Sequence, residues 1–241
     1  MCSSDLFDQY DLVLVDQDGV GLERAKLFLE AEYRVGVETV QCDLGVPFAA
    51  DELYRTIRGK TVDILINNAG FGLYGKFSET NWATEEKMIY LHIHTPIRLT
   101  KLVLKEMTGR GRGMILNVSS LASFQPGPFF SVYSASKVFL QSFSQAVATE
   151  LKGSGVTVTV FCPGQTKTGF AKGVALRSGS KESKVPVFSS SAVRVATIGY
   201  RGMKKGRILV IPGFLNKLVA TLARLVPGPV SASINGRIQQ R

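Results

Sequence analysis

A tyrosine and a lysine stand four residues apart in the segment YSASK, at Tyr133 and Lys137, so a helix would present both on one face. A phenol has an unperturbed pKa of about 10, and a nearby ammonium stabilises the phenolate and lowers that pKa. Ser120 lies thirteen residues before Tyr133, after the apolar run 114–118, which predicts a buried strand. Together these side chains predict proton exchange with an alcohol or ketone oxygen. The alternative is a tyrosine and a lysine on an exposed helix face that carry no chemistry.

Strands and helices must position these side chains, and the sequence predicts them from apolar runs that alternate with helical periodicities. This alternation is typical of a parallel sheet with crossover helices. The expected strands are 12–15, 39–41, 64–66, 114–118, 156–161 and 208–211. The expected helices are 21–32, 49–58, 82–107, 131–152 and 191–204. Such sheets bind ligands at the carboxyl ends of their strands. The residues expected at that edge are Asp16, Asp43, Asn67, Ser120 and Pro163.

Four motifs in this order resemble the short-chain dehydrogenase/reductase family, over residues from about 10 to about 170. They are NNAG at 67–70 after the apolar run DILI, the second serine of NVSS at Ser120, YSASK at 133–137, and CPGQTKT at 162–168. The resemblance implies an α/β fold, a Rossmann-like doubly wound parallel sheet with helices on both faces. It also implies an NAD(P)-dependent oxidoreductase that transfers a hydride between nicotinamide and a small-molecule carbonyl or secondary alcohol. The serine, the tyrosine and the lysine would form its catalytic set.

The same resemblance implies which residues contact the cofactor. Asp16 would accept hydrogen bonds from the adenosine ribose and repel a 2′-phosphate, which favours NAD over NADP. The alternative for Asp16 is a loop residue that caps the next helix, and Asp43 is either an adenine contact or a turn residue. The full implied set is Asp16, Asp43, Leu44, Asn67, Ala69, Gly70, Tyr133, Lys137, Pro163, Gly164, Thr166 and Thr168.

His92 stands where the family usually has an asparagine that supports a water-linked proton relay to the lysine. An imidazole can donate and accept hydrogen bonds, so His92 is expected as a fourth member of the catalytic set. The alternative is a packed helix residue in a slower or altered enzyme. His92 and His94 would point to different faces of a helix, so no metal site is expected.

The glycine-rich turn that opens a dinucleotide-binding fold is not found at the start of this sequence. The first expected strand resembles the family's second strand, so the chain lacks the family's first β-α unit. We expect an N-terminal truncation, either natural or a sequencing artefact, in which residues 1–9 are non-native or a remnant of the lost helix. An empty central strand position would expose sheet edges and weaken cofactor binding.

Composition sets limits on the chain as a whole. With 241 residues and 45% hydrophobic content, a single domain is expected. Cys2, Cys42 and Cys162 are too few and too scattered for a disulfide framework, which favours a reducing compartment. No apolar run is long enough to span a membrane and no signal-peptide pattern is recognisable, so we expect a cytoplasmic protein. The net charge of +10 is not gathered in one dense block, and no nucleic-acid partner is expected.

Two segments near the C-terminus have several possible functions. Residues 171–190 are small, polar and basic, and predict a mobile lid or loop. Residues 212–241 predict an amphipathic helical tail that covers the substrate pocket, packs on a partner subunit or contacts a membrane surface. Helices 82–107 and 131–152 resemble those that pair between subunits in the family, which implies a homodimer or homotetramer. A catalytically silent scaffold that binds a nucleotide or a protein is the competing function.

Overall fold

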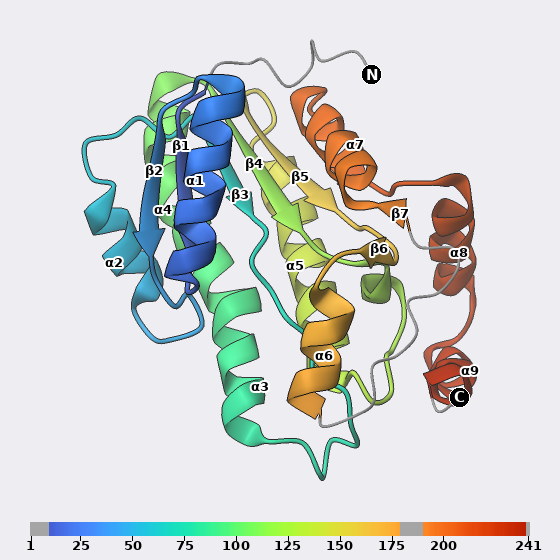
Figure 1. Ribbon diagram of the computed structural model, residues 1–241. Coiled ribbons are helices and arrows are strands. Elements are labelled where there is room, and N and C mark those ends of the chain that lie inside the picture. Colours follow the sequence, from blue (N-terminus) through green and yellow to red (C-terminus); the bar gives the residue numbers. More distant parts are fainter. Residues whose placement is uncertain (1–9, 179–189, 240–241) are drawn as a thin grey trace.

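The computed structural model describes residues 10–178 and 190–239, and parallel strands lie between two layers of helices (Figure 1). The strands are β1 (Leu12–Asp16), β2 (Val37–Gln41), β3 (Ile64–Asn67), β4 (Gly113–Val118), β5 (Val156–Phe161), β6 (Thr166–Lys167), β7 (Ser190–Ser191) and β8 (Leu209–Val210). The α-helices are α1 (Gly19–Tyr33), α2 (Ala49–Thr56), α3 (Trp82–Ile89), α4 (Thr95–Arg110), α5 (Ser131–Glu150), α6 (Phe170–Ser178), α7 (Ala192–Lys204), α8 (Phe214–Leu225) and α9 (Gly228–Gln239). Two short turns complete them, the π-helical η2 (Tyr90–His94) and the 3-10 helical η3 (Leu121–Phe124).

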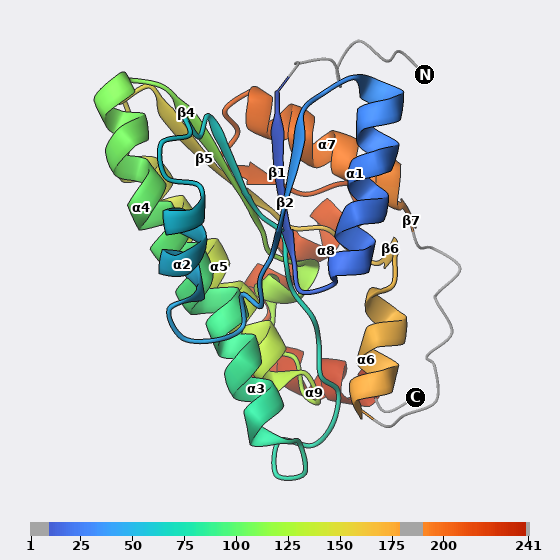
Figure 2. The same ribbon diagram turned by 60° about the vertical axis from the view of Figure 1, so that its left-hand side comes forward.

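The main sheet has the order β3-β4-β5-β8, and all neighbouring strands are parallel. Figure 2 shows its strands between α4 and α5 on one side and α1 and α7 on the other. Because side chains alternate along a strand, Ile115 packs with Val103 of α4, while the next residue, Leu116, packs with Val195 of α7. Burial on both faces explains why β4 is almost continuously apolar, and the threonines that alternate with valines in β5 are also buried or half-buried. The expected Rossmann-like doubly wound sheet is confirmed.

The sheet is interrupted between β1 and β3. Among the residues that the structure describes, β1 pairs with β2 and β3 pairs with β4, in two separate sheets. Val13 of β1 and Ile66 of β3 are 38% and 48% exposed, which is high for apolar side chains in a parallel sheet. Val15 and Leu65 still contact one core cluster beneath α2 and α4, which joins the two parts. The interruption agrees with the expected empty strand position, while residues 1–9 lie outside the described part.

The helix expected at 82–107 consists of three pieces, and this corrects the prediction of one continuous helix. α3 ends at Ile89, η2 makes a wider π turn, and α4 begins at Thr95. Pro96 stands at the start of α4, where it has no N–H to donate and its ring crowds the carbonyl four residues earlier. A wider turn relieves that conflict. The π turn contains His92, so the irregularity lies within the candidate site.

Two further segments differ from expectation. The first part of the loop expected at 171–190 is helical, because α6 buries Val174 and Ala175; residues 179–189 lie outside the described part. The tail contains two helices, α8 and α9, separated by a break at residues 226–227. Pro229 lies in the first turn of α9, where proline is tolerated. No helix within 10–178 or 190–239 is both long and apolar enough to cross a bilayer.

Candidate active site

Ser119 and Ser120 follow β4 and face the helix that carries the YSASK segment, α5. The Ser119 hydroxyl donates to the backbone carbonyl of Lys137 at 2.8 Å, and the Ser119 N–H donates to the carbonyl of Phe161 at 2.7 Å. Ser119 therefore ties α5 and β5 to the end of β4. Ser120 contacts the Tyr133 side chain, and Lys137 Nζ lies 5.9 Å from the Tyr133 ring centroid, so the structure brings the three side chains together at the carboxyl end of β4.

The Ser120 hydroxyl oxygen accepts the N–H of Ala122 at 3.1 Å, which leaves its proton available for donation. Burial raises the pKa of the Tyr133 phenol above its ordinary value, and the side-chain hydrogen bond with Ser120 opposes this rise. The sequence-based expectation of a lowered pKa is therefore wrong for this structure. The reason is desolvation of the buried phenol, and the charge of Lys137, whose Nζ lies 5.9 Å from the Tyr133 ring centroid, is not among the causes of the pKa shift.

Lys137 is a buried cation whose ammonium donates to a backbone carbonyl. Its Nζ donates to the Val118 carbonyl at 3.0 Å. Burial lowers the pKa of the Lys137 ammonium to about 8, because desolvation disfavours the charged form, and Cys162 opposes this shift. Burial also raises the pKa of the Cys162 thiol to about 11, so this thiol is neutral near pH 7. Lys137 is thus charged at neutral pH but releases its proton more easily than a surface lysine.

His92 occupies the π turn with hydrogen bonds at both ring nitrogens. The Phe71 N–H donates to His92 Nε2 at 3.2 Å, and His92 Nδ1 lies 2.9 Å from Ser136 Oγ. Ser136 donates its one hydroxyl proton to the Tyr133 carbonyl at 2.7 Å, so Nδ1 must carry the imidazole proton and donate to Ser136. Burial, aided by the charge of Lys137, holds the pKa of His92 well below its usual range. His92 is therefore a neutral imidazole with a fixed tautomer.

This geometry bears on the two expectations for His92. A proton relay needs a nitrogen that faces the reacting groups, whereas both His92 nitrogens are engaged with protein groups. His92 instead connects the Phe71 backbone, through Ser136, to the turn of α5 that bears Tyr133. The His92 and Tyr133 ring centroids lie 5.8 Å apart in an edge-to-face arrangement. The packed alternative fits, and its consequence is to hold Tyr133 in place.

A cavity of about 500 Å³ lies beside this centre, at the carboxyl ends of β1, β2 and β3. Its lining includes five of the residues expected to contact the cofactor. These are Asp16, Asp43, Leu44, Ala69 and Gly70. The volume lies within the range of pockets that bury small organic ligands. The structure therefore gathers residues from three separate strands around one space.

Asp16 faces this cavity and does not cap the following helix. The N-cap of α1 is Asp18, whose carboxylate accepts the N–H of Gly21 at 3.0 Å. Asp16 accepts the N–H of Asp18 at 2.9 Å through one carboxylate oxygen. The capping alternative for Asp16 is therefore excluded, and its remaining acceptor capacity is open to a ligand.

Asp43 is paired with Lys87, which the sequence reasoning did not identify. Lys87 Nζ lies 2.6 Å from an Asp43 carboxylate oxygen and 3.2 Å from the Gln17 side-chain oxygen. The N–H of Gly45 donates to the other Asp43 oxygen at 2.9 Å. Burial alone would raise the pKa of Asp43, but the hydrogen bonds from Lys87 and Gly45 lower it below its ordinary value. No sequence signal marked Lys87, because it lies on an ordinary amphipathic helix.

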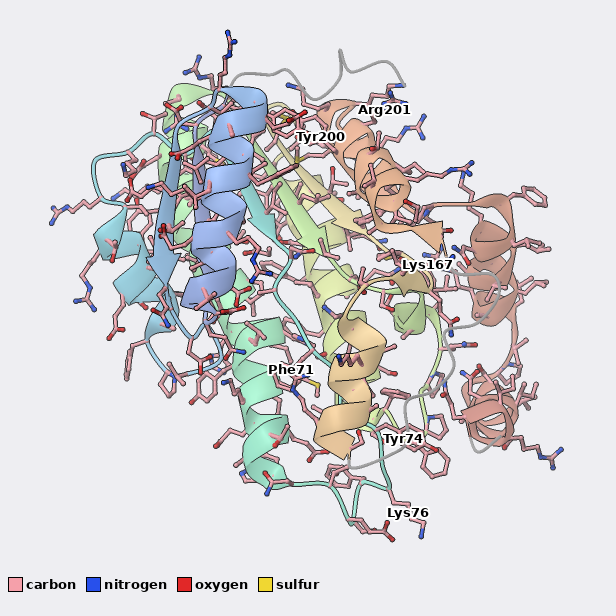
Figure 3. All side chains as sticks on the ribbon, viewed as in Figure 1. Phe71, Tyr74, Lys76, Lys167, Tyr200 and Arg201 are labelled. Carbon is pink, nitrogen blue, oxygen red and sulfur yellow. The ribbon has the colours of Figure 1, made fainter. Side chains whose placement is uncertain are left out.

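Gly70 and Arg177 shape the cavity where it meets the catalytic centre. A β-carbon at Gly70 would lie 2.8 Å from His92 Nε2 and 3.5 Å from Lys137 Nζ, so only glycine fits without displacement. Arg177 of α6 lines the cavity, and its guanidinium carbon lies 4.6 Å from the Phe71 ring centroid. Figure 3 shows Phe71 in the loop after β3, close to α6. The segment 171–190, expected to be a loop, therefore contributes the positive charge of Arg177 to the lining of the cavity.

Several other residues expected to contact the cofactor do not line this cavity. Asn67 donates through its side-chain amide to Asn117 at 2.8 Å, and Asn117 donates to Ser144 at 2.9 Å, so Asn67 braces the sheet. None of Pro163, Gly164, Thr166 and Thr168 is among the residues that line the cavity. The Pro163 carbonyl accepts the Leu121 N–H at 2.8 Å, and the Thr168 hydroxyl accepts the Phe170 N–H at 3.3 Å. These contacts fix the turn between β5 and α6.

Comparisons with known proteins bear on this arrangement. A family model described as short chain dehydrogenase matches residues 2–178. The mouse protein named 17-beta-hydroxysteroid dehydrogenase type 3 is 33% identical over 138 residues, which are 56% of this chain and 45% of that protein. The mouse dehydrogenase/reductase SDR family member 7B is 31% identical over 87% of this chain and 75% of its own length. The chain spans about half the length of several curated relatives that it matches.

Solved structures agree with the fold. A short-chain dehydrogenase from Sphingobium yanoikuyae, in complex with NADPH, matches with a TM-score of 0.78 and 27% identity, over 93% of this chain and 90% of that one. A bulky-bulky ketone specific alcohol dehydrogenase from Comamonas testosteroni matches with a TM-score of 0.76 and 24% identity, over 92% and 85% of the two chains. At that second level of identity the likeness concerns the fold alone.

Proposed function

The chain belongs to the short chain dehydrogenase family, and from this premise we propose that it transfers a hydride between NAD or NADP and a small-molecule carbonyl or secondary alcohol. The observation that carries the proposal is the convergence of Ser120, Tyr133 and Lys137 beside the cavity that Asp16 and Asp43 line. The Sphingobium relative bound NADPH, which supports a nicotinamide cofactor for this chain.

The residues around the cavity fit such a cofactor. Asp16 and Asp43 offer carboxylate acceptors for sugar and base donors, and small residues at Ala69 and Gly70 let the backbone approach a ligand closely. Asp16 favours NAD, because a carboxylate repels a 2′-phosphate. When bound, the nicotinamide ring supplies or accepts the hydride. The buried ammonium of Lys137 lies near enough to Gly70 to bind a hydroxyl at the same end of the cavity.

The side chains of this chain would handle the proton and the oxygen of the substrate. In the reductive direction the carbonyl oxygen would accept hydrogen bonds from Ser120 and Tyr133. As the carbonyl carbon gains the hydride, the oxygen gains the phenol proton of Tyr133, which gives the alcohol and a phenolate. The charge of Lys137 would stabilise that phenolate. A buried phenol with a raised pKa holds its proton firmly until the oxygen of the substrate becomes basic enough to take it.

The surroundings of Tyr133 support an apolar substrate. The ring centroids of Phe130 and Phe170 lie 6.0 Å and 5.6 Å from that of Tyr133. Tyr74 continues this aromatic cluster, with its centroid 5.3 Å from that of Phe130. The names of two relatives refer to a hydroxysteroid and to very-long-chain 3-oxoacyl-CoA. We propose a ketone or secondary alcohol with an apolar body.

A homo-oligomer with a cytoplasmic location completes the proposal. Phe139 and Phe143 of α5 have stacked rings with centroids 6.4 Å apart, and Val138 and Phe139 are exposed. These side chains support pairing of α5 with a second copy, because exposed apolar clusters mark interaction sites.

The test is nicotinamide oxidation with a panel of ketones, alcohols and steroids, followed by absorbance beside a separate binding measurement with NADH and NADPH. We expect turnover by the unmodified chain and by Tyr33→Phe, and none by Tyr133→Phe. Cofactor affinity should be nearly the same in all three proteins. Full turnover by Tyr133→Phe would remove the phenol from the mechanism.

A silent scaffold is the second candidate. The observation in its favour is the locked, neutral His92 at the position where the family has a relay residue. Binding of NADH without turnover of any substrate in the panel would support it and contradict the enzyme proposal.

A further inference from the structure

Helix α8 has its small side chains turned inward and its large apolar side chains turned outward. The buried residue of the helix is Ala220. At 100° per residue, the exposed apolar side chains occupy one continuous face of the helix. These residues are Phe214, Leu215, Leu218, Val219, Leu222 and Leu225. Phe214 and Leu225, at the two ends of the helix, are 79% and 75% exposed. A helix that only covered the core would show the opposite distribution.

Helix α9 continues this apolar surface. Its exposed residues Val230, Ile234 and Ile238 recur every four positions and so lie on one face. The helix is fixed to the body of the protein, since Asn235 donates to the Pro126 carbonyl at 2.9 Å. Figure 1 shows α8 and α9 one above the other at the edge of the molecule. We call the exposed faces of α8 and α9 the tail surface.

The net charge of the chain resides entirely in the segment that contains the tail surface. Residues 1–182 contain 19 Lys and Arg against 19 Asp and Glu, whereas residues 183–241 contain ten Lys and Arg and no acidic residue. On the tail surface itself, Lys217, Arg224 and Arg237 are exposed beside the apolar faces. The guanidinium carbon of Arg224 lies 4.9 Å from the Phe124 ring centroid. This contact holds the positive charge of Arg224 near the C-terminal end of α8.

We propose that the tail surface docks on a membrane that contains anionic lipids, with α8 lying in the plane of the headgroups. The combination of an exposed apolar face, flanking cations and an acid-free segment is what such a surface attracts. At twelve residues α8 is about 18 Å long, so it lies on a bilayer and does not cross it. A second copy of the chain would bring its own Lys217, Arg224 and Arg237 against the same three cations, with no acidic residue on either helix, which opposes pairing through this face.

The experiment is flotation of the full chain with vesicles, which requires no turnover and is independent of the proposed enzyme activity. The vesicles are phosphatidylcholine alone or phosphatidylcholine mixed with phosphatidylserine. We expect binding to the mixed vesicles, weaker by roughly tenfold on phosphatidylcholine alone and weaker as salt rises. Leu218→Glu with Leu222→Glu should lower the binding to mixed vesicles on the order of a hundredfold.

A matched control makes the same change in charge on a different helix. Val20→Glu with Leu27→Glu replaces two exposed apolar residues of α1 by the same acids, and it should bind mixed vesicles like the unmodified chain. Circular dichroism of both variants checks that the fold is retained. Equal loss in both variants, or undiminished flotation of the α8 variant, overturns the proposal. So does a lipid-free dimer, seen by sedimentation velocity, that only the α8 variant dissociates, because the face would then belong to a second copy.

Discussion

Nδ1 of His92 and Oγ of Ser136 lie 2.9 Å apart, and this contact links the π turn to the helix that carries Tyr133. Because Ser136 donates its proton to the Tyr133 carbonyl, the contact fixes which His92 nitrogen is protonated. The other nitrogen accepts the Phe71 N–H at the loop after β3. A single neutral imidazole thus links the loop after β3 to helix α5, which carries Tyr133 and Lys137.

His92 should make the stability of the protein depend on pH below about 6.5, the ordinary pKa of histidine. Its pKa in the folded state is lowered, so the unfolded chain binds a proton that the folded chain refuses. The stabilisation is therefore complete above the unfolded pKa and is lost as pH falls, by up to about 1.4 kcal/mol for each pH unit.

Denaturant titrations at several pH values measure this dependence. His92→Asn should remove that part of the slope, whereas His94→Asn should leave it intact, since His94 is exposed on the same turn. An unchanged slope in His92→Asn would show that His92 is not the group responsible.

The sequence predicted what depends on short-range pattern. The expected strands match β4 and β5 within a residue, because runs of apolar and β-branched residues favour strands. The spacing of Tyr133 and Lys137 predicted one shared helix face, and both residues lie in the first two turns of α5. The pairing of Asp43 with Lys87 was not predictable, since the two residues are 44 positions apart. The π turn was not predictable either, since it depends on a proline that also occurs in ordinary helix starts.

The direction of the Tyr133 pKa shift was also out of reach from the sequence. Spacing shows that Lys137 is near, but the outcome depends on the balance between attraction and desolvation, which only burial and distance decide. The same limit applies to Arg177, because nothing in a small, polar, basic segment indicates that its helix turns one cation toward a cavity.

The burial of the Lys137 ammonium should lower the free energy of unfolding at neutral pH. Burial lowers its pKa from the ordinary 10.5 to about 8, so the unfolded state gains a proton between those values and stability is lost as pH falls from 10.5 to 8. At neutral pH, Lys137→Met should therefore raise the free energy of unfolding by up to about 3 kcal/mol, while turnover is lost. Lys152→Met, at an exposed position, is the control and should change neither quantity much. A lower unfolding midpoint for Lys137→Met would contradict the assigned cost of burial.

Asp16 should set the preference between the two nicotinamide cofactors. Asp16→Asn removes the charge that repels a 2′-phosphate while an acceptor oxygen remains, so KM for NADPH should fall by roughly tenfold and KM for NADH should change less. Asp18→Asn is the matched control, because it removes an equal charge two residues away and an asparagine caps α1 as well as an aspartate does. Initial rates with both cofactors give the ratio of KM values. Equal shifts in the two variants would mean that general charge, and not contact, decides the preference.

Gly70 should be intolerant of even one added carbon. The β-carbon of Gly70→Ala would lie 2.8 Å from His92 Nε2, and that ring is held by the Phe71 N–H and by Ser136. We expect a loss of about 1–3 kcal/mol in the free energy of unfolding, as for other overpacked sites. Gly109→Ala provides the contrast, because this glycine lies in α4 with nothing near its would-be β-carbon, and alanine should stabilise the helix by about 0.5–1 kcal/mol. Thermal and urea unfolding of both variants measure the difference, and a Gly70→Ala protein as stable as the unmodified chain would show that the His92 ring is free to move.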